Sequence, residues 1–166
     1  MVGGKHQANF KYTNIQLISL VTLRVFIGWH FLYEGLVKAV NPNWSSVGYL
    51  MDSMGFLSGF FHSLAANRTI LSVVDFLNIW GLIAIGLGLI LGLFSRVALW
   101  CGIVLLTFYY LSHPPFIGLK FNLPMEGSYL VVNKNLIEIA AMVVLLLFPT
   151  SRMIGIDRLV FKEKNK

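Results

Sequence analysis

The chain has 166 residues, of which 57% are hydrophobic and only 12% charged, so it carries more apolar surface than a soluble domain of this size can bury. Its formal charge of +6 comes from residues at the chain ends and loop edges, which argues against nucleic-acid binding and favours an anionic leaflet of a lipid bilayer. The single cysteine, Cys101, excludes an intramolecular disulfide and the four-helix membrane enzymes that depend on cysteine pairs.

The first predicted element is a membrane-spanning helix over residues 15–40, since about 20 apolar residues cross the hydrocarbon core. No small-residue cleavage site directly follows it, so we interpret it as a retained span and not as a signal peptide. It carries four ionisable side chains, Arg24, His30, Glu34 and Lys38. Each costs about 2.5–3.5 kcal/mol at membrane depth on insertion scales, so each needs a partner or a function.

The long connection after this span is not polar. Its apolar residues recur at three- and four-residue spacing, which predicts an amphipathic helix over about residues 45–65. These apolar residues are Val47, Leu50, Met51, Met54, Leu57, Phe61 and Leu64. We expect the helix to lie in the outer interface of the membrane.

Two further spans are predicted at residues 70–94 and 95–112. Only Ser95 and Arg96 separate their apolar runs, so the two helices should form a tight antiparallel hairpin.

The second span also carries a stripe of small residues. Ala84, Gly88 and Gly92 fall four residues apart on one helix face. Such a stripe lets two helix backbones approach closely, so we expect ordinary bundle packing there.

The connection over residues 113–128 contains Pro114, Pro115 and Pro124 and therefore cannot be helical throughout. We expect it to form an ordered lid or plug in the outer loop between the third and fourth spans.

The fourth span is predicted at residues 129–148, followed by a basic cytoplasmic tail at residues 149–166. No repeat or internal boundary divides the chain, so residues 1–166 form a single membrane domain. The predicted fold is an all-α, four-transmembrane-helix bundle with one interfacial helix between its first two spans.

Positive charge is distributed unevenly across the predicted membrane. Eight lysines and arginines lie on the side of the termini and three on the other side. The eight are Lys5, Lys11, Arg96, Arg152, Arg158, Lys162, Lys164 and Lys166, and the three are Arg68, Lys120 and Lys134. Because positive loops stay inside, we predict a cell's inner (cytoplasmic) membrane with both termini in the cytoplasm.

With this topology, polar side chains of all four spans converge on the outer half of the bundle, apart from one arginine just to the cytoplasmic side of mid-membrane. We therefore predict a polar cavity that opens toward the outer face. Its candidate residues are Arg24, His30, Glu34, Lys38, Asp75, Asn78, His113, Asn135 and Glu138.

Some of these residues also have purely structural interpretations. Glu34 and Lys38 have the spacing of an i,i+4 ion pair at a helix end. Asp75 could be a first-turn acid favoured by the helix dipole, and a capping box fits the spacing of Asn135 and Glu138.

Haem and metal sites are not expected. His30 lies near mid-membrane and His113 at the outer boundary, a height difference of about 10 Å that does not suit a bis-histidine haem. The sequence also contains no phosphate-binding glycine loop, no closely spaced metal-ligand cluster and no nucleophile elbow, so hydrolytic chemistry is not indicated.

Several short motifs together resemble the DoxX family of four-helix membrane proteins. The first span and its continuation contain Leu23-Arg24, Gly28, Phe31-Leu32, Gly35, Lys38, Asn41-Pro42, Trp44-Ser45-Ser46 and Gly48-Tyr49-Leu50. Later matches are GLFSR at 92–96, VVNKNLIE at 131–138 and GIDRL at 155–159. The resemblance covers nearly the whole chain.

This family includes the small membrane subunit of thiosulfate:quinone oxidoreductase, so the resemblance implies a membrane redox subunit that docks a partner or approaches quinone. Arg24, Lys38 and Glu138 match polar positions of the family pattern. The sequence indicates no redox centre of its own, so electrons would come from a second subunit.

Two functional hypotheses follow. In the first, the chain is an integral subunit of a quinone-linked oxidoreductase, without an intrinsic cofactor, whose cavity holds a quinone headgroup or a small sulfur anion. In the second, it is a noncatalytic scaffold or assembly factor that holds a partner protein with its methionine-bearing interfacial helix. Both include the lipid bilayer and a partner subunit or homo-oligomer as partners, and whether the chain belongs to an enzyme stays open. A transporter is disfavoured because there is no inverted repeat.

Overall fold

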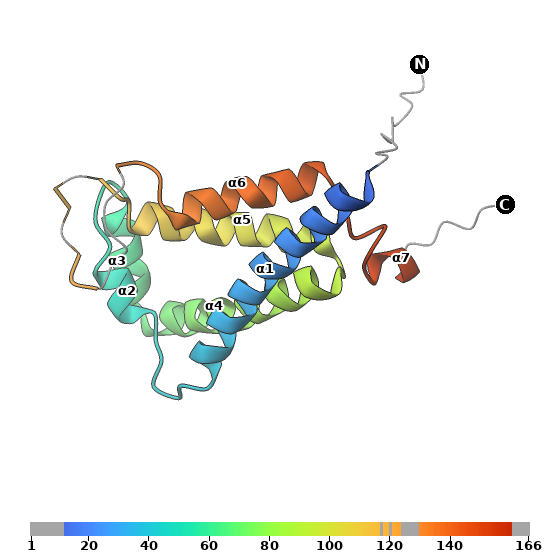
Figure 1. Ribbon diagram of the computed structural model, residues 1–166. Coiled ribbons are helices and arrows are strands. Elements are labelled where there is room, and N and C mark those ends of the chain that lie inside the picture. Colours follow the sequence, from blue (N-terminus) through green and yellow to red (C-terminus); the bar gives the residue numbers. More distant parts are fainter. Residues whose placement is uncertain (1–11, 117, 120, 124–129, 161–166) are drawn as a thin grey trace, which may run out of the picture.

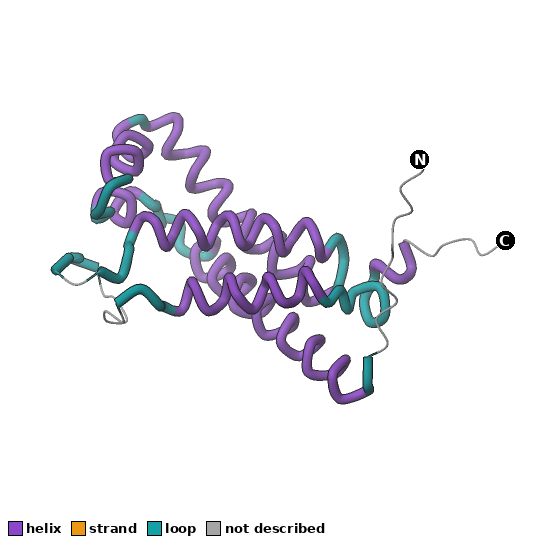
Figure 2. The backbone as a smooth tube through the Cα atoms, turned by 90° about the horizontal axis from the view of Figure 1, so that it is seen from above, coloured by secondary structure: helices purple, strands orange, loops and turns teal. Residues whose placement is uncertain are grey.

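The computed structural model describes residues 12–116, 118–119, 121–123 and 130–160. Within these residues all regular secondary structure is helical. The helices are α1 (Asn14–Ala39), α2 (Val47–Met51), α3 (Ser58–Ala66), α4 (Arg68–Leu91), α5 (Ser95–Ser112), α6 (Lys134–Leu147) and α7 (Asp157–Val160). The long helices run between two ends of the molecule, where the connections gather (Figures 1 and 2).

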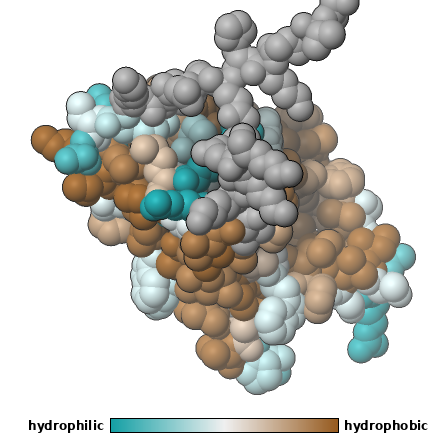
Figure 3. Space-filling model, turned by 90° about the vertical axis from the view of Figure 1, so that its right-hand side faces the viewer, coloured by the Kyte–Doolittle hydropathy of each residue, from teal (hydrophilic) through white to brown (hydrophobic). Residues whose placement is uncertain are grey.

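Three of the helices, α1, α4 and α5, are long and apolar enough to cross a membrane. Many of their large side chains face outward, among them Phe26, Trp29 and Trp100, which are 60–69% exposed. A soluble protein rarely exposes so much apolar surface, and Figure 3 shows how far it extends on one face. These features indicate a membrane protein.

The fourth predicted span is shorter than expected. Helix α6 begins at Lys134 and not at residue 129, which itself lies outside the described residues. The side chain of Asn133 caps α6 by accepting a hydrogen bond of 3.1 Å from the backbone N–H of Leu136, and Leu130 has a positive φ of 67°. The 14 residues of α6 extend about 21 Å, less than the hydrocarbon thickness of about 30 Å.

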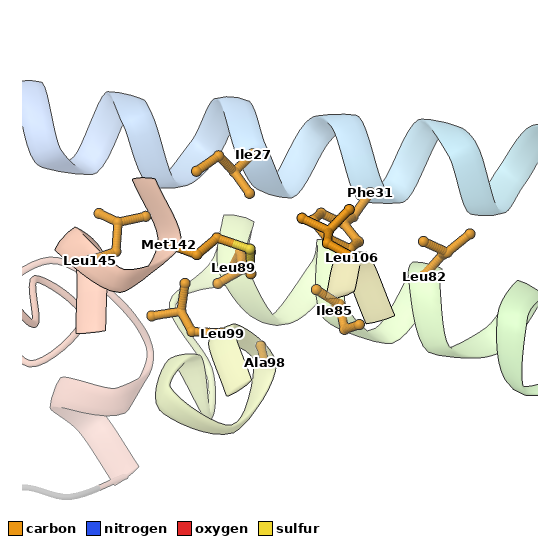
Figure 4. Close-up of a cluster of buried hydrophobic side chains, with 10 residues drawn as sticks. All are labelled: Ile27, Phe31, Leu82, Ile85, Leu89, Ala98, Leu99, Leu106, Met142 and Leu145. Atoms are coloured by element: carbon orange, nitrogen blue, oxygen red, sulfur yellow. The ribbon is translucent and has the colours of Figure 1, made fainter. Parts of the chain in front are cut away.

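One hydrophobic core joins four of the helices (Figure 4). Ile27 and Phe31 of α1 meet Leu82, Ile85 and Leu89 of α4, together with side chains of α5 and α6. The contributions from α5 and α6 are Ala98, Leu99, Leu106, Met142 and Leu145. Helix α6 therefore shares the core of the three long helices.

The close approach of α1 and α4 depends on a glycine outside the predicted stripe. A Cβ atom at Gly86 would lie 2.5 Å from the backbone nitrogen of Leu32 and 2.7 Å from the carbonyl oxygen of Gly28. Gly88 instead faces Leu93 and Ala98. The predicted stripe packs within the bundle as expected, with Gly88 against α5 and Gly92 against Gly155, whereas the α1 contact falls on Gly86, because tertiary packing sets the helix rotation that decides which small residue meets which neighbour.

The connection between α1 and α4 does not contain the single helix predicted for residues 45–65. It forms two short helices, α2 and α3, with a break at residues 52–57. Gly55 adopts a left-handed φ of 97°, which an α-helix does not accommodate. The apolar spacing continues through this break, which is why the periodicity alone predicted one helix.

The hairpin between α4 and α5 turns earlier than predicted. Gly92 ends α4 with a φ of 65° and Phe94 precedes α5 with a φ of 47°. Ser95 and Arg96, which were expected to form the turn, are the first residues of α5. The left-handed conformation at the end of α4 suits glycine, as is usual at helix C-termini.

The predicted tail begins with a packed segment. The backbone N–H groups of Ile156 and Asp157 donate to the carbonyls of Leu91 and Gly92 at 3.0 and 2.9 Å. Residues 150–157 therefore pack under the α4–α5 turn, and the start of α1 lies at the same end of the molecule as α7 (Figure 1).

Candidate functional site

A cavity of about 530 Å³ lies among α1, α4, α5 and α6, where α2 approaches them. We call this end of the helices the cavity end, and the end with α7 the terminal end. Six of the nine predicted site residues line the cavity, namely His30, Glu34, Lys38, Asn78, His113 and Asn135. Its apolar and aromatic lining comprises Phe31, Trp44, Tyr49, Leu82, Leu106, Tyr109, Pro115 and Leu123.

The seventh residue, Glu138, does not line the cavity itself but contacts His30, which does. Its carboxylate oxygens lie 3.0 and 3.1 Å from Nδ1 of His30, and its side chain is only 11% exposed. A carboxylate on Nδ1 orients the ring and holds a proton on that nitrogen. The other nitrogen, Nε2, makes no hydrogen bond within the described part of the chain, so it is free for a ligand in the cavity.

Because Glu138 is bonded to His30 and Asn133 caps α6, the capping box of Asn135 and Glu138 is wrong. If Asn135 were the N-cap, the helix would begin at residue 136, but α6 begins at Lys134. Asn135 lines the cavity instead.

The ion pair of Glu34 and Lys38 is present at the cavity wall. Lys38 Nζ lies 2.8 Å from Glu34 Oε2 and 5.7 Å from the centre of the Trp44 ring. The charge of the lysine is therefore largely balanced by its neighbour one helical turn away, and it is also close to an aromatic face.

On the α4–α5 side, Asn78 and Tyr109 form a second polar pair. Asn78 Nδ2 donates a hydrogen bond of 2.7 Å to the hydroxyl oxygen of Tyr109. Both residues line the cavity. The backbone carbonyl of Tyr109 accepts a bond of 3.3 Å from the Tyr49 hydroxyl, which ties α2 to α5.

Asp75 supports the cavity wall without lining it. Its carboxylate accepts hydrogen bonds of 2.8 Å from the Ser45 hydroxyl and from the backbone N–H of Ser46, and another from the Ser46 hydroxyl. The interpretation as a first-turn acid is wrong, because Asp75 lies two turns inside α4. It holds the segment before α2 against α4.

Sequence reasoning missed Asp52, which anchors the segment of residues 121–123, of which Leu123 lines the cavity. This carboxylate accepts bonds of 3.0 and 2.7 Å from the backbone and side-chain nitrogens of Asn122, and 3.1 Å from the N–H of Leu123. His113 Nε2 lies 3.7 Å away. Asp52 interrupts an apolar pattern, which was the available signal, but its partners lie 70 residues further along the chain.

Around His113 the cavity wall is aromatic. Its ring stacks on Tyr49 with a centroid distance of 4.0 Å and lies 4.7 Å from Phe121. Burial lowers the pKa of His113, although the nearby Asp52 charge opposes this effect. Burial alone would raise the pKa of Asp52, but the bonds from Asn122 and Leu123 outweigh it, and this pKa is lowered.

These two shifts act in the same direction on stability. Where the folded-state pKa of a group is lowered, the unfolded state binds more protons as pH falls, so stability is lost with acid. We expect the free energy of unfolding in detergent to fall from pH 7 to pH 5 through His113, and again below the usual carboxyl pKa through Asp52. A His113→Phe variant, which keeps the ring stacking, should lose less stability than wild type between pH 7 and 5. Parallel curves for the two proteins would contradict this assignment.

Arg24 does not line the cavity, so the prediction that placed it there is wrong. It is 3% exposed, and its guanidinium donates to the hydroxyl of Thr150 at 3.1 Å and to the carbonyl of Ile154 at 2.8 Å. It lies about 9 Å along α1 from His30 toward the terminal end. The guanidinium fastens the segment after α6 to α1.

The carboxylate of Asp157 completes this terminal structure. It accepts hydrogen bonds of 2.7 and 3.2 Å from the N–H groups of Phe94 and Ser95, which are unsatisfied at the start of α5. We call Arg24, Thr150, Ile154 and Asp157 the terminal latch.

Among the described residues, no three or more His, Cys, Asp or Glu side chains are grouped to hold a metal ion. The cavity instead combines a histidine–carboxylate pair, an amide–hydroxyl pair and aromatic walls. Such a set can hold a flat, mostly uncharged group and exchange protons with it.

Comparisons with protein-family models, with curated proteins and with solved structures gave no match.

Proposed function

We propose that this chain is an integral membrane subunit of a quinone-linked oxidoreductase and that its cavity holds a quinone headgroup. The observation that carries the proposal is the pairing of His30 with Glu138 in the wall of a cavity among apolar helices. A proton-exchanging pair at a site that opens among membrane helices suits a ligand that is membrane-soluble and takes up or releases protons when its redox state changes.

The shape and lining of the cavity support a ring-shaped headgroup. A volume of about 530 Å³ lies within the usual range for small-molecule sites. Phe31 and Leu82 provide apolar walls, while His30 on α1 and Tyr109 on α5 provide polar groups from different helices. A quinone has two oxygens on opposite sides of its ring, and these match polar groups presented from different walls.

A small sulfur anion fits this lining less well. Lys38 is paired with Glu34 at 2.8 Å, and Glu138 adds a second carboxylate next to His30. An anion in the cavity would face these two carboxylates. Of the two lysines in the described lining, Lys38 is paired with Glu34 and Lys134 interacts within the protein as well, so an uncharged quinone is the better-supported ligand.

His30 would then act in proton transfer. Reduction of a quinone takes up two electrons and two protons. The electrons would come from a partner subunit that carries a redox centre. One proton would come from Nε2 of His30, whose imidazolium form Glu138 stabilises, and the second would come from solvent at the other quinone oxygen.

The proposal includes α6 as a fourth span and membership of the DoxX family. Helix α6 shares the core of the three long helices, and a short hydrophobic span is accommodated by local thinning of the bilayer. The proposed orientation has the terminal end in the cytoplasm of a cell's inner membrane, supported by the eight-to-three distribution of lysine and arginine.

The test is to extract and quantify quinones from detergent-purified wild type and variants. We expect wild type to retain quinone, and Glu138→Gln and His30→Leu to retain at least about tenfold less, since each removes a charge-assisted hydrogen bond at the site. Thr107→Val is the matched control, because its hydroxyl bonds only to the carbonyl of Ile103 on an exposed face of α5. Equal quinone content in all four proteins, or none in wild type, would contradict the proposal.

A second candidate function, a noncatalytic scaffold, is favoured by the outer surface of α2 and α3. Val47, Met51, Phe56 and Phe60 are 41–80% exposed there, an adaptable apolar surface that a partner protein could cover. Affinity purification separates the two functions: a flavin or haem subunit in the purified complex supports the oxidoreductase, whereas a secreted or lipid-linked protein without a cofactor supports the scaffold.

A further inference from the structure

The polar pair of Asn78 and Tyr109 contains an unused hydrogen-bond acceptor. Asn78 Oδ1 is buried and has no hydrogen-bond partner within the described residues, while Nδ2 of the same amide donates to the Tyr109 hydroxyl at 2.7 Å. Both side chains line the cavity. A buried acceptor without a partner is unfavourable, so a native site normally satisfies it with water or a ligand.

The Tyr109 hydroxyl complements this acceptor. Its oxygen already accepts a hydrogen bond from Asn78, so its own proton remains available for donation. The described residues provide no acceptor for that proton. The pair therefore presents one acceptor and one donor, on neighbouring residues, to whatever occupies the cavity.

A hydroxyl group is the simplest ligand group that satisfies both. It donates its proton to Asn78 Oδ1 and accepts the proton of Tyr109. A ketone or an ether oxygen can accept from Tyr109 but leaves Asn78 Oδ1 without a partner. Sites built to bind a hydroxyl discriminate strongly against analogues that lack it, because the buried polar group is then left unsatisfied.

We propose that Asn78 and Tyr109 seat a ring hydroxyl, so that the cavity selects the hydroxyl-bearing form of its ligand over the carbonyl form. This inference rests on the proposed quinone site and assigns it a preference for the reduced ligand, the quinol. Asn78 on α4 and Tyr109 on α5 are the specificity-determining residues in this assignment. His30 on α1 and Glu138 on α6 form the pair that exchanges protons.

The site also suits an amphiphile that arrives from the bilayer. Helices α1 and α6, which carry His30 and Asn135, diverge toward the cavity end (Figure 1). Glu34 is 48% exposed in its side chain, so the α1 wall is accessible there.

The test measures binding to the full-length protein in detergent by titration calorimetry, without oxygen. Four probes are compared: a short-chain benzoquinone, its quinol, and a redox-inert pair consisting of a 4-alkylphenol and its methyl ether. We expect wild type to bind the quinol at least about tenfold more tightly than the quinone, and the phenol at least about tenfold more tightly than the ether.

Variants then locate the selectivity. Asn78→Leu and Tyr109→Phe should reduce both ratios to about twofold or less. Tyr110→Phe is the matched control, since its hydroxyl bonds to the carbonyl of Val131 outside the cavity lining, and it should keep the wild-type ratios.

The outcomes distinguish this inference from the proposed function. If wild type binds the quinone as tightly as the quinol, or the ether as tightly as the phenol, hydroxyl selection is wrong while the quinone site stands. If wild type binds neither quinone nor quinol, the proposed function fails as well. The wild-type ratios decide the inference even where a variant does not fold.

Discussion

Replacing Arg24 by glutamine should destabilise the protein by about 2–4 kcal/mol, because hydrogen bonds to a charged group contribute about 1.5–3 kcal/mol each when buried. Arg24 donates two such bonds, to Thr150 and to the carbonyl of Ile154. The shorter amide cannot reach both partners, so at least one of them loses its donor. The free energy of unfolding, measured by denaturant titration in detergent micelles, checks this expectation.

The matched control for this variant is Arg96→Gln. Arg96 is exposed in the first turn of α5, and surface substitutions of this kind usually change stability by less than about 0.5 kcal/mol. If both variants unfold like wild type, the terminal latch does not hold the segment after α6.

Replacing Gly86 by alanine should cost about 3 kcal/mol, at the upper end of typical overpacking penalties. The added Cβ would lie 2.5 Å from the nitrogen of Leu32, 2.7 Å from its Cα and 2.7 Å from the carbonyl oxygen of Gly28. All three atoms belong to the backbone of α1, so no side-chain rotation relieves the contact. Helices α1 and α4 must separate, which would also move His30 relative to Glu138.

Gly81→Ala provides the control for this second variant. A Cβ at Gly81 meets no atom within 4 Å, and alanine is favoured over glycine inside a helix by roughly 0.5–1 kcal/mol. This variant should therefore be as stable as wild type or slightly more stable in the same denaturant titration. If Gly86→Ala behaves like Gly81→Ala, the helices are not held at the distance that the structure assigns.

Gly86→Ala and Arg24→Gln disturb two different contacts that together hold the helices in place. The α1–α4 contact at Gly86 fixes how α1 is positioned in the bundle, and the terminal latch fixes where the chain continues after α6. Glu138 on α6 and His30 on α1 can lie 3.0 Å apart only when both helices are held. Stability at a distance from the cavity and ligand binding within it are therefore connected through helix placement.

Much of the cavity could be anticipated from residue types and their order along the chain. Ionisable and amide side chains are costly among apolar helices, so His30, Glu34, Asn78 and Asn135 were conspicuous in the sequence. Their helix positions predicted a common depth. The ion pair of Glu34 and Lys38 followed from spacing alone, since residues four apart share a helix face.

The partners of these residues could not be predicted in the same way. His30 and Glu138 are 108 residues apart, and Arg24 and Thr150 are 126 apart. Arg24 has the same chemical character as the cavity residues, and only its distance along α1 and the packing of residues 150–157 place it elsewhere. Spacing defines the height of a residue along its helix, but it does not define which face of the helix packs against which neighbour.

The sequence by itself determined that this is a helical membrane protein, because apolar runs of this length have no soluble alternative and a backbone in lipid must satisfy its own hydrogen bonds. It also determined which side chains are too polar to face lipid. Only the tertiary structure decided which glycine forms the α1–α4 contact, that α2 and α3 are separate, and which polar residues meet. Those choices depend on helix rotation and on contacts between distant segments, which local periodicity does not encode.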